Sequence, residues 1–235
     1  MLVMITGGGT GIESTLSVSP AAFHLWRQQP LPFSGIALSV GTQVSLTDTE
    51  RPERLTAAAV SSNLFDVLRI PFVRGDRRTA LRAPDTMVLT ESEALRRFGT
   101  VDIVGRTLTL AFAAGPVDYR ITGVVQDPPP NSHLALSVVA RLDFESLFGE
   151  DSPFLTEWMP KNGWVYARLR PGADVAEIAR QMPAWERRNI PDENYGDSSF
   201  NQGDQQDYRL VNVADVHLGR AQAGAMSPGN DARTI

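Results

Sequence analysis

The stretch TMVLTESEALRRFG, residues 86–99, changes its hydrophobic pattern halfway along. Its first five residues form a short apolar run typical of a buried strand, and the remainder has the spacing of an amphipathic helix. Thr90 with Glu93 three residues later is the pattern of a capping box, which predicts that the helix begins at Thr90. The residues expected on its buried side are Ala94, Leu95 and Phe98.

The segments that follow predict a β-hairpin and then a buried strand. IVGRTLTLAF (103–112) and VDYRITGVVQD (117–127) alternate apolar and polar residues, and the AAGP between them suits a turn. The three prolines at 128–130 favour an extended crossing segment. ALSVVARL (135–142) is apolar enough for a strand buried on both faces.

The segments that precede this stretch predict a meander of strands between two short helices. The first helix begins after Ser19-Pro20, with Phe23, Leu25 and Trp26 on one face. Gly41 and the turn-like DTERPE separate three expected strands, which are GIALSV (35–40), TQVSLT (42–47) and RLTAAAVS (54–61). The second helix lies in SSNLFDVLRI and is expected to stop at Pro71.

The C-terminal third predicts a strand, a helix and a closing strand. GWVYARLR (163–170) alternates, and PGAD (171–174) is a turn that supplies the expected N-cap, Asp174. VAEIARQMPAWERR (175–188) is an amphipathic helix that Pro183 is expected to kink or end. The polar stretch 191–206 is expected to be a loop, and 207–218 the closing strand. This spacing favours a βαβ-like unit.

The glycine-rich start LVMITGGGTGIES (2–14) raises the question of a dinucleotide-binding turn. Glu13 occupies the position of the third glycine, where its carboxylate would face the phosphates. The only lysine is Lys161, and the residue four positions before it is glutamate, so a Tyr-x-x-x-Lys pair is absent. We therefore interpret residues 1–16 as a flexible lead-in.

The composition of the chain argues against several classes of function. The formal net charge of −5 gives no reason to expect nucleic acid as a partner, and the absence of cysteine excludes thiolate catalysis and sulfur-based metal sites. No apolar run reaches the length of a membrane helix. Both ends resemble connectors, and we expect the chain to be a segment of a longer protein.

Five segments, in order and at consistent spacing, resemble the MacB-like periplasmic core domain of FtsX/MacB-type ABC transporter permeases. They are VSSNLFDVLRIPFVRGD, VLTESEALRRFG, DIVGRTLTL, YRITGVVQDPPPNSHL and VADVHL. The likeness covers roughly residues 18–220. The resemblance implies an α+β fold of two lobes, with a porter-like βαβ lobe built from both chain ends and an inserted, mainly β lobe.

The expected boundaries follow from this organisation. They are a flexible lead-in at 1–16, a porter-like lobe at 17–75 and 161–220, an inserted lobe at 76–160, and a flexible tail at 221–235.

The resemblance also implies a place and a role. The domain would lie on the extracytoplasmic side of the bacterial inner membrane, without a catalytic centre or cofactor, and transmit conformational change between membrane helices and an external substrate or partner protein. Its implied partners are its own transmembrane helices, a cytoplasmic ATPase subunit or domain, a second permease copy, and a periplasmic protein or lipid-linked substrate. Two alternatives stay open: an extracytoplasmic hydrolase using Asp or Glu, and a passive ligand-binding module.

Few side chains are candidates for a site. The histidines His24, His133 and His217 are too far apart in sequence for a helix-spaced metal pair. The carboxylate pairs Asp66 with Asp76 and Glu91 with Glu93 have no spacing that selects them for catalysis. Trp26 and Trp164 are expected to be buried. The residues expected to contact a partner are Trp158, as an exposed aromatic between the lobes, and Arg74, Arg77 and Arg78.

Overall fold

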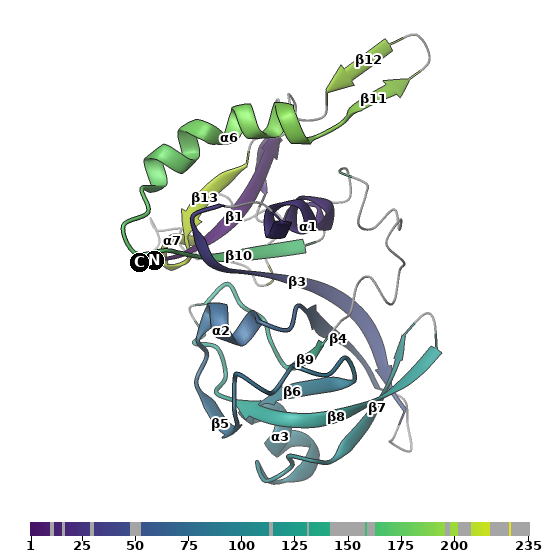
Figure 1. The fold of residues 1–235 in the computed structure, drawn as a ribbon. Helices are drawn as coiled ribbons and strands as arrows, with labels where there is room; N and C mark the ends of the chain where they lie inside the picture. The colour runs from purple at the N-terminus through teal and green to yellow at the C-terminus, as the bar shows by residue number, and fades with distance from the viewer. Residues whose placement is uncertain are drawn as a thin grey trace. The chain divides into compact units, whose positions relative to one another are not determined.

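The computed structural model describes part of the chain, and the fold below concerns that part. The described residues are 1–9, 12–15, 17–28, 31–47, 53–112, 115–130, 132–141, 158, 163–195, 198–201, 208–216 and 226. They form two compact units, unit 1 from Met1–Ile36 with Asp151–Ile235 and unit 2 from Ala37–Glu150. Figure 1 shows their elements.

The strands and helices are distributed over both units. The strands of unit 1 are β1 (Leu2–Gly9), β2 (Ile12–Thr15), β10 (Gly163–Leu169), β11 (Asp192–Tyr195), β12 (Ser198–Asn201) and β13 (Arg209–Asn212), and its helices are α1 (Pro20–Gln28), α6 (Val175–Asn189) and α7 (Val213–Val216). Strand β3 (Phe33–Leu46) begins in unit 1 and continues into unit 2. Unit 2 also contains β4 (Glu53–Val60), α2 (Leu64–Leu68), β5 (Phe72–Gly75), β6 (Thr86–Thr90), α3 (Glu91–Phe98), β7 (Thr107–Phe112), β8 (Gly115–Val125) and β9 (Val138–Arg141).

Unit 1 is a sheet in the order β13-β1-β10-β3, with β2 beside β1. Strand β1 pairs antiparallel with both β10 and β13, so these two strands run parallel to each other on either side of it. Helix α6 connects them, which makes β10-α6-β13 a split βαβ unit and confirms the predicted one. Helix α1 lies between β2 and β3 in the chain.

Unit 2 contains a ring of six strands. The pairs run from β3 to β4, β9, β6, β8 and β7, and β7 returns to β3 through Ser45 with Ala111 and Leu46 with Leu110. Strand β5 pairs with the end of β8. Apolar side chains fill the interior, among them Leu46, Leu89 and Ile121. The predicted β7–β8 hairpin and the buried strand β9 are confirmed.

The predicted flexible lead-in at 1–16 is wrong, because it contains the paired strands β1 and β2. Leu2–Gly9 form β1, and the side chains of Val3, Met4 and Ile5 are fully buried. The apolar run LVMI has partners on both sides in the sheet, and its burial outweighs the flexibility of the glycines that follow.

Strand β3 corrects the predicted meander and the predicted lobe boundaries. Gly41 lies within this 14-residue strand, paired with Ala58, and does not separate two strands. Strand β4 pairs with β9, and β3 pairs with β7, so these segments belong to unit 2, whereas we predicted a boundary at 75/76. The sequence pattern shows that β3 and β4 need a partner sheet but does not identify it.

The helix after β6 begins and ends as expected but is capped differently. Thr90 is the N-cap of α3 without a side-chain cap hydrogen bond, and Glu93 turns towards arginines of its own helix. The predicted capping box is therefore wrong. Ala94 is buried and Phe98 partly buried as predicted, but Leu95 is 47% exposed.

Three further predictions differ in detail. Helix α2 ends at Leu68 because Arg69 adopts a left-handed conformation with φ 60°, before Pro71 is reached. Helix α6 continues through Pro183 to Asn189, and its predicted N-cap Asp174 is confirmed. The polar stretch 191–206 contains the antiparallel hairpin β11–β12, and the closing segment is strand β13 followed by α7. The predicted tail at 221–235 lies outside the described residues, apart from residue 226.

Candidate functional site

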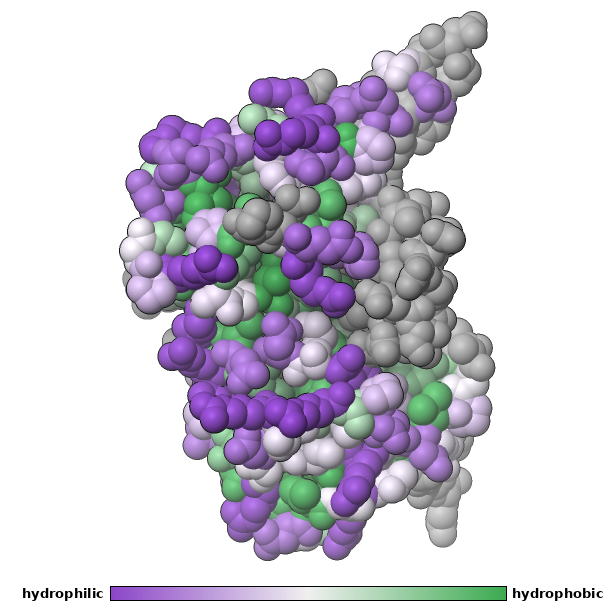
Figure 2. All heavy atoms as spheres, in the orientation of Figure 1, coloured by the Kyte–Doolittle hydropathy of each residue, from purple (hydrophilic) through white to green (hydrophobic). Residues whose placement is uncertain are grey.

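An exposed basic surface lies on the segment 69–82 of unit 2. The segment carries five arginines and one acidic residue, Asp76, although the whole chain carries −5. We call these arginines the basic surface; they are Arg69, Arg74, Arg77, Arg78 and Arg82, and all are exposed. Figure 2 shows hydrophilic side chains gathered over the region of α2 and β5. The sequence analysis selected three of the five, and a charge count over the whole segment would have added Arg69 and Arg82.

The turn at 76–82, which carries three of these arginines, is held against the closed ring of six strands in unit 2, called the barrel below. Ala80 and Leu81 are buried, and the hydroxyl of Thr122 donates to the carbonyl oxygen of Ala80. The guanidinium of Arg141 donates to the carbonyl oxygen of Leu81 at 3.0 Å. Within the turn, the Asp76 carboxylate accepts a hydrogen bond from the backbone N–H of Arg78 at 2.7 Å.

Two arginines of the basic surface have carboxylate partners. Arg74 Nε donates to Asp102 at 2.6 Å, and Arg77 Nε lies 3.6 Å from Asp66 on α2. These pairs are exposed and contribute little stability. Arg69 is the C-cap of α2, the helix that carries Asp66.

The remaining predicted contact residue does not have the expected environment. Trp158 is 6% exposed, so the prediction of an exposed aromatic is wrong. Trp26 is buried as predicted, whereas Trp164 is only partly buried. His133 is buried, His24 contacts Gln28 at 2.9 Å, and His217 lies outside the described residues.

A compact ion cluster links α3 to the start of β4. The carboxylate of Glu93 accepts hydrogen bonds from Arg96 at 2.9 Å and from Arg97, and both arginines also bond Glu53 at 3.0 Å. Burial raises the pKa of Glu93, but the hydrogen bonds from Arg96 and Arg97 outweigh it and hold the pKa below its usual value. Glu93 therefore stays ionised, which suits a structural ion pair and not a general acid.

An aromatic cluster joins helices α1 and α6 of unit 1 to Tyr208, the residue before β13. The Trp26 ring lies 5.6 Å from Trp185 of α6 and 4.8 Å, edge to face, from Tyr208. The buried Glu186 carboxylate accepts a hydrogen bond from the backbone N–H of Tyr208 at 2.9 Å. Burial raises the pKa of Tyr208 well above its usual range, and the nearby Glu186 adds to this. The cluster fixes α1, α6 and β13 together.

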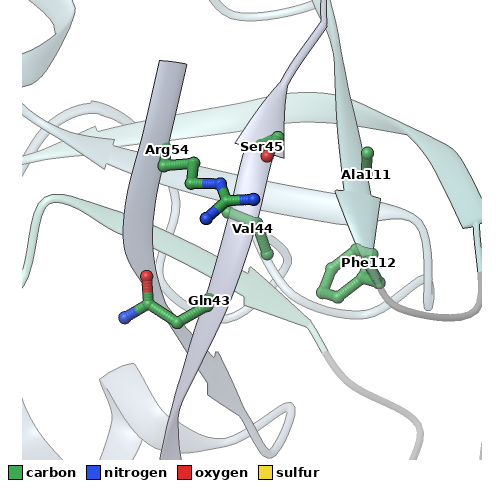
Figure 3. Close-up of a pocket in the computed structure, with 6 residues that line it drawn as sticks. All are labelled: Gln43, Val44, Ser45, Arg54, Ala111 and Phe112. Atoms are coloured by element: carbon green, nitrogen blue, oxygen red, sulfur yellow. The ribbon is translucent and has the colours of Figure 1, made fainter. Parts of the chain in front are cut away.

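Unit 2 also has an open pocket of about 420 Å³ where β7 pairs with β3. Figure 3 shows the Arg54 side chain of β4 extended across β3, with Phe112 of β7 on the other side of Val44. Gln43, Ser45 and Ala111 complete the lining. The pocket therefore offers one guanidinium and one aromatic ring.

The described residues provide neither a metal centre nor a membrane helix. Among them, no group of three or more His, Asp or Glu side chains is arranged to hold a metal ion. No helix in the described ranges combines the length and the apolar character needed to span a membrane.

Several solved structures share this fold. A domain described as that of a permease protein from Porphyromonas gingivalis aligns with a TM-score of 0.65 at 18% identity, covering 89% of both chains. The periplasmic region of MacB from Actinobacillus actinomycetemcomitans aligns at 0.58 and 13% identity, covering 92% of this chain and 90% of that one. The extracellular domain of the noncanonic ABC-type transporter YknZ from Gram-positive bacteria aligns at 0.55 and 12% identity, covering 90% and 100%.

Sequence comparison gives the family. No curated protein sequence matches the chain. The family model described as the MacB-like periplasmic core domain matches residues 1–185, which include β1, all of the barrel and most of α6. The two-lobed α+β architecture predicted from the resemblance agrees with this match. The chain therefore belongs to the MacB-like periplasmic core domain family of ABC transporter permeases, and its place is the extracytoplasmic side of the cell membrane.

Proposed function

We propose that this domain transmits conformational change between membrane helices and an external substrate or partner protein, and catalyses no reaction itself. The observation that carries the proposal is the position of β1. This N-terminal strand lies between β10 and β13, so the first and last strands of the described fold are hydrogen-bonded neighbours. A force applied at either strand passes directly to the other through the ladder.

The carboxylates considered for hydrolysis support a non-catalytic role. Asp66 pairs with Arg77, Asp76 accepts from the Arg78 backbone, and Glu93 is enclosed by arginines. A hydrolase needs one carboxyl group with a raised pKa, and the pKa of Glu93 is lowered.

The partners follow from the family. Permeases of this class work with cytoplasmic ATPases. We propose that this domain is flanked by its own membrane helices, is coupled through them to such an ATPase, and contacts a second permease copy or a periplasmic protein or lipid-linked substrate.

The experiment inserts a flexible segment into the chain through which we propose that force is transmitted. Six Gly/Ser residues are inserted after Val216 in the full-length permease, and the same insertion between β11 and β12 is the matched control. We expect the first insertion to abolish complementation of a deletion strain while ATP hydrolysis continues, and the control to complement. Full complementation by both insertions would contradict mechanical transmission.

A passive ligand-binding role is the second candidate, favoured by the pocket beside Arg54 and Phe112. Native mass spectrometry of freshly purified protein tests it. A retained small molecule that is lost in Phe112→Ala would favour this role, and a spectrum of bare protein would count against it.

A further inference from the structure

The basic surface combines a high local charge with a fixed backbone. Its five arginines lie within 14 residues, and three of them are on a turn held by the burial of Ala80 and Leu81 and by hydrogen bonds from Thr122 and Arg141. A mobile basic loop would lose conformational entropy on binding, whereas this turn is already ordered.

Three of these arginines have no carboxylate partner among the described residues. Arg74 and Arg77 are neutralised locally by Asp102 and Asp66, whereas Arg69, Arg78 and Arg82 form no described salt bridge. Arg78 follows Asp76, but that carboxylate is engaged by the Arg78 backbone N–H. That hydrogen bond leaves the negative charge of Asp76 in place, so the surface presents three unpaired arginines and one unpaired carboxylate to solvent, a local net charge of +2.

The unpaired arginines fit an extended anionic surface, because they lie at exposed positions of two elements and share no described acceptor. Arg69 caps α2, whereas Arg78 and Arg82 lie on the turn after β5, so they come from two elements. A phosphate pocket needs donors that converge on one point, but a layer of phospholipid headgroups supplies an anion opposite each arginine.

We propose that the basic surface binds anionic phospholipid headgroups of the membrane next to which the domain works. The proposal rests on the proposed function in one respect, the position of the domain beside a bilayer. Each arginine near an anionic membrane surface strengthens binding about fivefold, so the three unpaired arginines together contribute on the order of 100-fold. The attraction is screened by salt within about 10 Å at 0.1 M.

The test is flotation of the 235-residue chain with vesicles. One set is pure phosphatidylcholine and the other contains roughly 30% phosphatidylglycerol, a content chosen to give a strong negative surface potential. We expect binding to the anionic vesicles alone, and its loss at high salt. Equal binding to neutral vesicles, or none to anionic ones, would overturn the proposal.

Matched variants locate the binding site. The triple variant Arg69→Gln, Arg78→Gln, Arg82→Gln should weaken binding on the order of 100-fold. The control Arg120→Gln, Arg187→Gln, Arg188→Gln removes the same charge from other exposed arginines and should retain most of the binding. Arg→Lys substitution at the first three positions should preserve it. An equal loss in both Gln variants would overturn the proposal, because only net charge would then matter.

A second copy of the chain is the competing occupant. If light scattering shows a dimer that the Arg69, Arg78 and Arg82 substitutions dissociate, the surface is a protein interface and the proposal is wrong. Vesicle binding requires neither ATPase nor membrane helices. A negative result in the vesicle experiment is therefore distinguishable from a negative result in the Gly/Ser insertion experiment, which tests transmission alone.

Discussion

The carboxylate of Asp127 accepts hydrogen bonds from both the backbone N–H of Ser92, at 3.0 Å, and the Ser92 hydroxyl. Ser92 lies in the first turn of α3, where backbone N–H groups have no partner within the helix. Pro128 follows Asp127 and favours the extended backbone there. The helix is thus capped from 35 residues away, by the segment QDPPP.

Replacing Asp127 with Ala should destabilise unit 2 by about 1 kcal/mol, because a cap hydrogen bond and a favourable helix-dipole charge are lost together. Asp127→Asn keeps an acceptor but not the charge and should cost less. Urea unfolding monitored by circular dichroism measures both. Equal stability of Asp127→Ala and the natural protein would show that the contact does not support α3.

Glu93→Gln should destabilise the domain by about 3 kcal/mol at neutral pH, since it leaves the buried guanidinium of Arg97 without its nearest carboxylate. The side chains of Glu93 and Arg97 are only 9% and 8% exposed. Because the pKa of Glu93 is lowered in the folded state, its contribution is present above its unfolded value, near 4.5, and is lost as the pH falls through the folded pKa.

Unfolding curves at several pH values check that the stabilising contribution of Glu93 is lost as the pH falls. The natural protein should lose stability below about pH 4.5, and Glu93→Gln should lose less over the same range. A steeper acid loss in the variant would contradict the assignment. Glu177→Gln is the matched control, because Glu177 pairs with Arg180 in an exposed position and should change stability little.

Gly123 allows β8 to pass close to β5. A Cβ at Gly123 would lie 2.5 Å from Cε1 of Phe72 and 3.2 Å from the carbonyl oxygen of Arg74. Gly123→Ala should therefore cost about 1–3 kcal/mol through overpacking. The double variant with Phe72→Val should recover part of that loss, and additive costs in a double-mutant cycle would refute the proposed clash.

Two substitutions in the aromatic cluster distinguish the contribution of packing to stability from that of hydrogen bonding. Trp26 is 1% exposed, and Trp26→Ala should destabilise unit 1 by about 3–5 kcal/mol through the cavity it leaves. Tyr208→Phe should change stability by less than about 1 kcal/mol, because the buried Tyr208 hydroxyl has no hydrogen-bond partner among the described residues. Thermal unfolding measures both, and a large loss in Tyr208→Phe would reveal a partner for that hydroxyl.

The sequence predicted the fold where local patterns carry the information. The alternation in β7 and β8, the N-cap Asp174 and the βαβ unit around α6 depend on neighbours in sequence and were confirmed. The capping of α3 could not be found in this way, because its acceptor is Asp127 and not Glu93. Long-range pairing likewise decides that Leu2–Gly9 is a central strand.

The candidate site was predicted only in part. Arg74, Arg77 and Arg78 were identified from their charge, and they lie on the exposed surface where charge is expected. Trp158 was misjudged, because a tryptophan in a segment without helix or strand periodicity gives no sign of what covers it. The pocket beside Arg54 combines strands β3, β4 and β7, and only the closure of the barrel brings β7 to β3.

The most direct test of transmission is a distance measurement in the full-length permease with its ATPase. The chain has no cysteine, so Leu95→Cys on α3 and Arg187→Cys on α6 can be spin-labelled uniquely within it at exposed positions, one in each unit. We expect the distance distribution between the labels to change when ATP binds and to return after hydrolysis. An identical distribution in all nucleotide states of a transporting complex would contradict the account.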